Sequence, residues 1–188
     1  SASSRNLYST VSSFRQEAIL FRDAIAKFRL PTAKRGGTLR IAIPRSFELN
    51  LDPGFAQTVV AAEVIYNLYD GLVRYGEGTD LHPALARRWS ISHDGLKYTF
   101  FLRDNGKFHD GRPVTAEDVK ASFERILRPD REFPATWPLM PVKGAKEFNE
   151  NKAQEVSGIR VVNAHTLEIE LVEPVGFFLA FLTLPELS

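Results

Sequence analysis

The pair His109-Asp110 invites a catalytic or metal-binding interpretation. The chain has four histidines and no cysteine, so thiolate metal sites, disulfides and a cysteine nucleophile are excluded. A zinc site needs three or four converging nitrogen, sulfur or oxygen ligands, and no such spacing occurs among His82, His93, His109 and His165. We therefore predict neither a metal site nor a cofactor.

Other arrangements that support enzyme chemistry are also missing from the sequence. No serine, histidine and aspartate stand in a recognisable nucleophile elbow, and no glycine-rich loop is suited to hold a phosphate. Glu168 and Glu170 form a carboxylate pair, but both fall on the solvent-facing side of a predicted strand, where solvated charge is the ordinary explanation. The sequence therefore predicts a protein that binds rather than an enzyme.

The composition is that of a soluble globular protein without a preference for polyanions. Of the 188 residues, 44% are hydrophobic and 25% are charged, which is ordinary for a domain with a buried core. Lysine and arginine (24) nearly balance aspartate and glutamate (23), so we predict no nucleic-acid partner. No apolar run approaches the roughly 20 residues of a membrane span, and the first residues do not have the pattern of a secretory signal.

A first strand and two hairpins make up the predicted β structure. Leu39, Ile41 and Ile43 alternate with more polar residues, which is typical of a strand. Asp94-Gly95 stands between two runs rich in aromatic and β-branched residues, and glycine tolerates the positive φ of such a turn. The predicted strands cover 38–43, 89–92, 98–102, 158–162 and 166–171, with Leu167, Ile169 and Leu171 on a buried face.

Helices are predicted between these strands, so the predicted fold class is α+β. Residues 59–69 have a helical pattern, and Asp70-Gly71 supplies its end. A second helix begins at Thr115, which can cap it while Asp118 returns the bond in a capping box. A third, short helix is expected near 145–151. The predicted inner face of the second helix comprises Val119, Ser122, Phe123 and Ile126.

Residues 1–35 differ from the rest of the chain. Apolar residues from Val11 to Phe28 recur at spacings of three and four, which places them on one stripe of a helix. The plainer interpretation is a helix packed on its own domain. The alternative is a partner-binding or membrane-proximal helix, because a seven-residue apolar repeat can seat a second helix. Dimers that dissociate when residues 1–30 are deleted would support the alternative.

Several segments together resemble one protein family. The motifs that carry the resemblance are Gly36 to Ile41, Leu51-Asp52-Pro53, Ile65 to Leu72, Pro83 to Ala86, Trp89, Asp94 to Phe100, Leu102-Arg103, Lys107 to Gly111, Pro113 to Val119 and Leu171 to Pro174. Their order and spacing are similar to those of the family 5 solute-binding proteins, which deliver oligopeptides, dipeptides, nickel complexes or sugars to ABC importers. The resemblance covers residues 36–185.

The resemblance implies a periplasmic-binding-protein-like type II fold, in which two lobes close on a ligand. This chain would be a partial N-terminal lobe with its extra subdomain. Residues 1–35 would be a helical extension, 36–54 the first strand and loop of the main lobe, 55–155 the inserted subdomain, and 156–188 the returning strands of the main lobe, truncated.

The resemblance also implies where a ligand lies. The loop after the first strand would face it at Gln57 and Val59, and the irregular segment after the capped helix would face it at Phe133 and Trp137. Binding clefts are mostly apolar with a few polar anchors, and Trp137 in a proline-flanked loop is a rigid aromatic surface of that kind. Packing of Trp137 against its own loop explains that residue equally well.

The implied function is capture of peptides or similar small solutes, metal complexes included, for an ABC importer. Lobe closure rather than bond making would do this work, with the importer's permease subunits as partners. The protein would be periplasmic or extracellular, with a lipoprotein anchor as one arrangement. As an N-terminal fragment, this chain presents one wall of the cleft, so its own affinity for solute is expected to be weak. The alternative is a solute-binding-like interaction or sensory module that acts through residues 1–30.

Overall fold

The computed structural model describes residues 38, 40, 50–76 and 78–188 of the chain. The helix predicted within residues 1–35 lies outside them, as does nearly all of the strand predicted over 38–43, so both stay predictions. The chain divides into two units after Ala42, and the architecture below is that of the second unit. No helix in the described ranges is both long enough and apolar enough to span a membrane.

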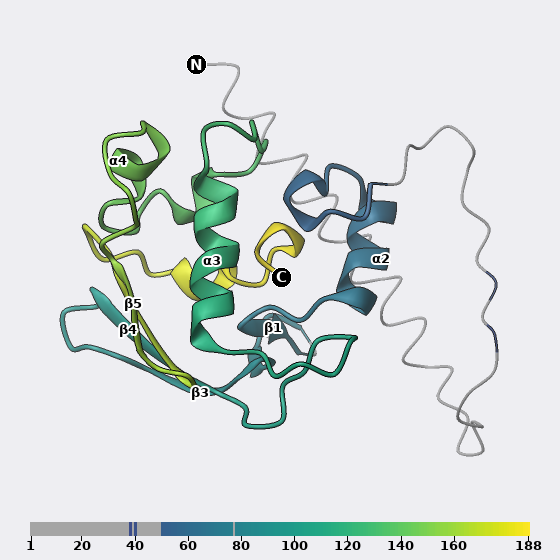
Figure 1. Ribbon diagram of the computed structural model, residues 1–188. Coiled ribbons are helices and arrows are strands. Elements are labelled where there is room, and N and C mark those ends of the chain that lie inside the picture. The colour runs from purple at the N-terminus through teal and green to yellow at the C-terminus, as the bar shows by residue number, and fades with distance from the viewer. Residues whose placement is uncertain (1–37, 39, 41–49, 77) are drawn as a thin grey trace. The chain divides into compact units, whose positions relative to one another are not determined.

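A four-stranded antiparallel sheet is the main β structure of this unit (Figure 1). Its strands are β3 (Ala86–Ile91), β4 (Lys97–Leu102), β5 (Ile159–Asn163) and β6 (Thr166–Glu170). They lie in the order β3-β4-β6-β5, and each predicted hairpin supplies one half. Both hairpin predictions are therefore confirmed, and Gly95 has the positive φ (71°) that its turn requires. The two halves join where β4 pairs with β6, with Phe100 opposite Leu167.

Alternation along the strands gives the sheet one apolar and one polar face. Tyr98, Phe100 and Leu102 of β4 are at most 4% exposed, and Leu167 and Ile169 of β6 are fully buried. The opposite face carries charged residues that pair across the strands. The ion pairs on that face join Glu168 to Arg160 and Lys97, and Glu170 to Lys143.

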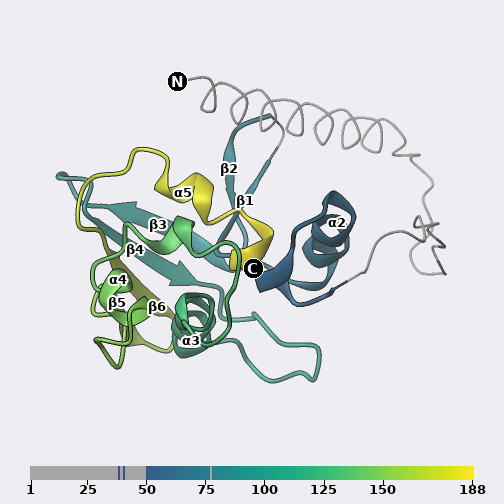
Figure 2. The same cartoon turned by 90° about the horizontal axis from the view of Figure 1, so that it is seen from above.

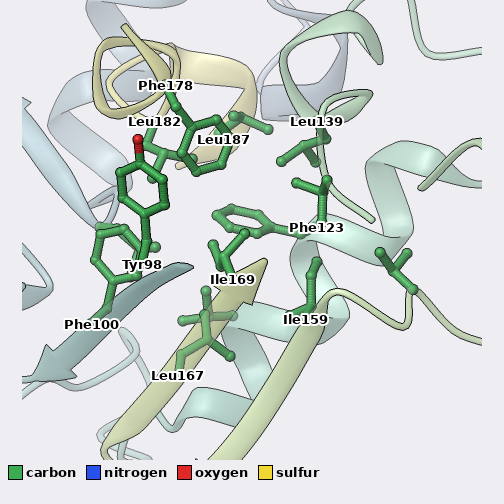
Figure 3. Close-up of a cluster of buried hydrophobic side chains, with 14 of the residues drawn as sticks. Tyr98, Phe100, Phe123, Leu139, Ile159, Leu167, Ile169, Phe178, Leu182 and Leu187 are labelled. Atoms are coloured by element: carbon green, nitrogen blue, oxygen red, sulfur yellow. The ribbon is translucent and has the colours of Figure 1, made fainter. Parts of the chain in front are cut away.

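Helix α3 (Ala116–Leu127) packs on β5 and β6 at the apolar face, and its Phe123 lies beside Ile169 (Figure 3). The predicted capping box is confirmed, because the Thr115 hydroxyl accepts from the Asp118 amide while the Asp118 carboxylate accepts from the Thr115 amide at 2.8 Å. The predicted inner face was wrong in one position. Ser122 is exposed, and the buried side of the helix includes Leu127 instead.

Helix α2 (Val59–Leu68) confirms the helix predicted over 59–69, but it does not end as expected. The chain leaves it through an extended Tyr69 (φ −125°, ψ 151°) rather than through a left-handed glycine. Gly71 has a different use, because a Cβ at that position would lie 3.2 Å from the carbonyl oxygen of Leu182. Glycine there permits the close approach of two backbone segments. Figure 2 shows α2 on the opposite side of the unit from β5.

Short elements complete the unit. The short helix predicted near 145–151 is confirmed as α4, which ends slightly earlier than expected. Phe178 and Leu182 in the C-terminal segment are fully buried, so this apolar segment folds back on the core (Figure 3). The elements are η1 (Pro53–Phe55), η2 (Trp137–Leu139), α4 (Ala145–Asn149), α5 (Phe178–Phe181) and η3 (Pro185–Leu187).

Two short strands were not predicted. β1 (Val73–Tyr75) and β2 (Leu81–Pro83) form an antiparallel ribbon apart from the main sheet. Val73 is 1% exposed, and the Gly76 amide donates to the Asp80 carbonyl at 2.7 Å to close the loop between the strands. Strands of three residues are too short for alternation to be recognised in a sequence.

The sheet and the core run without a break across residues 155 and 156. β4 pairs with β6 over five residues on each side, and Phe100, Phe123 and Leu167 belong to one hydrophobic cluster. The division implied by the resemblance, with a subdomain over 55–155 and returning strands over 156–188, concerns the lobe as a whole and stays a prediction.

Replacing Thr115 with alanine tests the capping box. We expect the free energy of unfolding to fall by about 1 kcal/mol, because the Asp118 amide loses its acceptor at the start of α3. Urea denaturation of the chain and its variant gives this difference. Ser122→Ala, on the exposed side of the same helix, is the control and should change stability by less than about 0.5 kcal/mol. Equal losses in both variants would contradict this role of Thr115.

Candidate functional site

The four residues predicted to face a ligand fall into two groups. Gln57 is exposed, and the exposed fractions of Val59 and Trp137 are 50% and 53%. Phe133 is only 5% exposed and belongs to the hydrophobic core. Three of the four predicted side chains are therefore accessible at the surface, whereas Phe133 lies beneath it.

Phe133 holds the loop that carries Gln57 and Val59. Its ring centroid lies 4.7 Å from that of Phe55, and a Cβ on Gly54 would overlap the ring. On its other side, the Arg125 guanidinium lies 4.8 Å from the ring centroid. The ring is therefore clamped between the 50–58 loop and the last turns of α3.

An ion pair fixes the same loop from its other end. Asp52 accepts from the Gly54 amide at 3.1 Å and so caps η1, and its carboxylate also pairs with Arg125 of α3. Both side chains are partly exposed, so water screens their attraction and the ion pair adds little to stability. Its main effect is to fix the position of the loop relative to α3. Arg125 thus contacts both Asp52 and Phe133. The loop and the helix form one framework under Gln57 and Val59.

Trp137 lies with two aromatic residues that the sequence did not indicate. The rings of Trp137 and Phe181 pack edge to face with centroids 4.9 Å apart, and those of Phe177 and Phe181 do so at 5.0 Å. Phe177 is 62% exposed. We call these three residues the aromatic row. The signal available in the sequence was the four-residue spacing of Phe177 and Phe181 in an apolar segment. That spacing indicates a buried helix face equally well.

The segment after the aromatic row contacts α2. The Tyr66 hydroxyl donates to the Thr183 carbonyl at 3.0 Å. Burial, and then the nearby Glu186 carboxylate, raises the pKa of Tyr66 well above its ordinary value, so this hydroxyl keeps its proton. Among the four predicted residues, Phe133 therefore packs against the loop that carries Gln57, and Trp137 packs against the C-terminal segment.

A cavity of about 560 Å³ lies between the 50–53 loop, the end of α2, α3 and η3. None of the four predicted residues lines it. Two ion pairs lie on its wall, Asp52 with Arg125 and Asp70 with Arg103. Two buried polar atoms on the same wall have no hydrogen-bond partner within the described ranges, the Nε of Arg103 and the Oε2 of Glu186. Burial raises the pKa of Glu186 above its ordinary value.

The histidines and carboxylates of the described residues include the candidate metal ligands and the carboxylate pair Glu168 and Glu170. No three of its His, Asp or Glu side chains are grouped so that they could hold a metal ion. Glu168 and Glu170 lie on the polar face of the sheet, where each pairs with a basic side chain. These ion pairs join neighbouring segments of the chain.

The family described as bacterial extracellular solute-binding proteins, family 5, matches residues 80–188. The chain therefore belongs to this family. The periplasmic murein peptide-binding protein MppA of Escherichia coli is 37% identical over 132 residues, which cover 69% of this chain and 24% of that protein. The dipeptide-binding protein DppE of Bacillus subtilis is 31% identical over 144 residues, covering 76% and 26%.

Solved structures show the same similarity. The murein tripeptide-binding protein MppA of E. coli superposes with a TM-score of 0.68 at 35% identity, covering 74% of this chain and 28% of that one. The substrate-binding domain of an oligopeptide ABC transporter from Bacillus anthracis gives 0.70 at 30% identity, covering 73% and 27%. These structures confirm the predicted α+β, periplasmic-binding-protein-like type II fold. The chain spans about a quarter of the length of these relatives.

The difference in burial between Phe133 and Trp137 predicts different losses in the free energy of unfolding when each is replaced with alanine. Phe133→Ala should lower the free energy of unfolding by about 3–5 kcal/mol, because it leaves a cavity between Gly54 and α3. Trp137→Ala should cost much less, since half of its surface is already in water. Urea denaturation of both variants decides the matter. A comparable loss in the two would show that Trp137 is a core residue, contrary to this structure.

Glu186→Gln tests the buried carboxylate. Because the folded-state pKa of Glu186 is raised, the wild-type chain is relatively most stable below the unfolded pKa and loses that stability as the pH rises through the folded one. The variant should therefore be more stable than wild type at pH 7, with the difference vanishing at about pH 3.5. Thermal unfolding across this range measures it, with the exposed Glu173→Gln as the control. A variant less stable at pH 7 would contradict the unpaired state of Glu186.

Proposed function

We propose that the protein containing this chain is the substrate-binding component of an ABC importer that captures peptides or similar small solutes. The observation that supports this most directly is the outward exposure of Gln57, Val59 and Trp137 on a buried framework. These are positions that the family resemblance assigns to the ligand-facing wall. In this proposal the permease subunits of the importer are partners, and the protein works in the periplasm or outside the cell.

Peptides are the solute class that the relatives favour. MppA is described as binding murein peptide, DppE dipeptides and several OppA proteins oligopeptides. Two other relatives are named as a heme-binding protein and a probable deoxycholate-binding protein. The fold therefore admits different ligands, and the choice of peptides for this protein rests on the greater number of peptide binders among these relatives.

The chain would contribute one wall of the binding cleft. Gln57 can donate to or accept from a peptide backbone, while Val59 and Trp137 offer apolar surface that is desolvated when a second lobe closes over the ligand. Closure is favoured to the extent that the ligand binds the closed form better than the open one. Binding in this proposal makes and breaks no covalent bond.

Binding by the complete protein tests the proposal. Isothermal titration with tripeptides should give saturable binding, and Val59→Asp should weaken it at least tenfold, because closure would bury an unpaired carboxylate. Val162→Asp, at an exposed position on β5, is the matched control and should leave the affinity unchanged. Absence of binding to any tripeptide, or equal losses in both variants, would refute the proposed function.

The isolated chain should bind the same peptides poorly. One wall buries only part of a ligand, so we expect a dissociation constant above about 1 mM, which corresponds to roughly −4 kcal/mol. Titration followed by NMR measures such weak binding directly. A submillimolar affinity for this chain alone would show that the second lobe is unnecessary, which would contradict capture by lobe closure.

A further inference from the structure

We propose that the aromatic row of Trp137, Phe181 and Phe177 is a subsite for one flat, uncharged ring of the solute. This role rests on the proposed function and names the ligand group that this part of the wall selects. The row combines two segments far apart in sequence, the turn η2 and the helix α5. Its consecutive ring centroids lie 4.9 and 5.0 Å apart, with interplanar angles of 86° and 73°.

The core holds the row in place. Pro138 and Leu139 next to Trp137 are buried, as are Phe178 and Leu182 next to the two phenylalanines. α5 is further tied to the sheet by Tyr98, whose ring centroid lies 5.0 Å from that of Phe178 and whose hydroxyl donates to the Val175 carbonyl at 3.3 Å (Figure 3). A ligand ring would therefore meet a preformed surface, which lowers the entropy cost of binding.

Two members of the row, Phe177 and Trp137, leave 62% and 53% of their surfaces in water. Phe181 contacts both of them and is itself partly buried against the core, so it ties the two exposed rings to the fold. At the two exposed positions, polar residues would fit at little cost to the core. A contiguous exposed apolar patch of this kind indicates an interaction site.

The size of the row fits a small group rather than a protein partner. An aromatic side chain presents about 150–250 Å², so three partly exposed rings offer on the order of 300 Å². A stable protein interface needs about 1,000 Å² or more in total, which argues against a second copy as the occupant. One further aromatic ring can join the row by stacking or by another edge-to-face contact.

The NMR signals of the indole N–H groups in this chain report on the row directly. The chain has two tryptophans, so Trp89→Phe and Trp137→Phe assign the two signals independently, and either variant suffices. N-acetylphenylalaninamide should shift the Trp137 signal saturably, with at least fivefold tighter binding than N-acetylalaninamide. Phe177→Ala should remove this preference, whereas Val162→Ala, exposed on β5, should keep it.

Three outcomes would overturn the subsite. They are equal shifts with both amides, an unchanged preference in Phe177→Ala, and a Trp137 signal that moves with protein concentration alone, which would reveal a second copy on the row. These outcomes are separate from failure of the proposed function. If the complete protein binds Ala-Ala-Ala as tightly as Ala-Phe-Ala, the subsite is wrong and the transporter role stands; if it binds neither peptide, the role fails.

Discussion

The pairing of β4 with β6 is the constraint on which the other features depend. Each hairpin can form locally, but only their union produces an apolar face wide enough to receive α3 and α5. Phe100 and Leu167 meet in this pairing, and both are fully buried. A slip of one residue would turn Glu168 toward the core and Leu167 toward water, so the register is strongly specified. The cost of such a slip keeps α5, and with it the aromatic row, at a fixed place.

The proposed binding wall is connected to this core through a few residues. Phe178 joins α5 to Tyr98 of the sheet, and Phe133 joins the 50–58 loop to α3. Charged residues act mainly at the junctions, as Arg125 does with Asp52. The exposed side chains assigned to the proposed wall, Gln57, Val59 and Trp137, carry no charge. In the proposed function such a surface would bind by desolvation and shape.

Local signals in the sequence predicted local structure well. Asp94-Gly95 identified a turn, and Thr115 with Asp118 identified the start of α3, because each depends on neighbours within a few residues. The errors and omissions have non-local causes. Gly71 is needed where Leu182 approaches, and β1 and β2 are too short for a periodic pattern.

Phe133 and Trp137 show the same limit at the candidate site. Both are aromatic residues in a proline-rich segment, and their sequence surroundings do not distinguish them. Their burial is decided elsewhere, since Gly54 and Arg125 enclose Phe133, while Trp137 packs edge to face with Phe181 and stays half exposed. The buried ring of Phe133 therefore sets the position of the 50–58 loop, and the ring of Trp137 remains accessible at the surface. A family pattern can place both near a cleft, but only the packing around each shows which one a solute can touch.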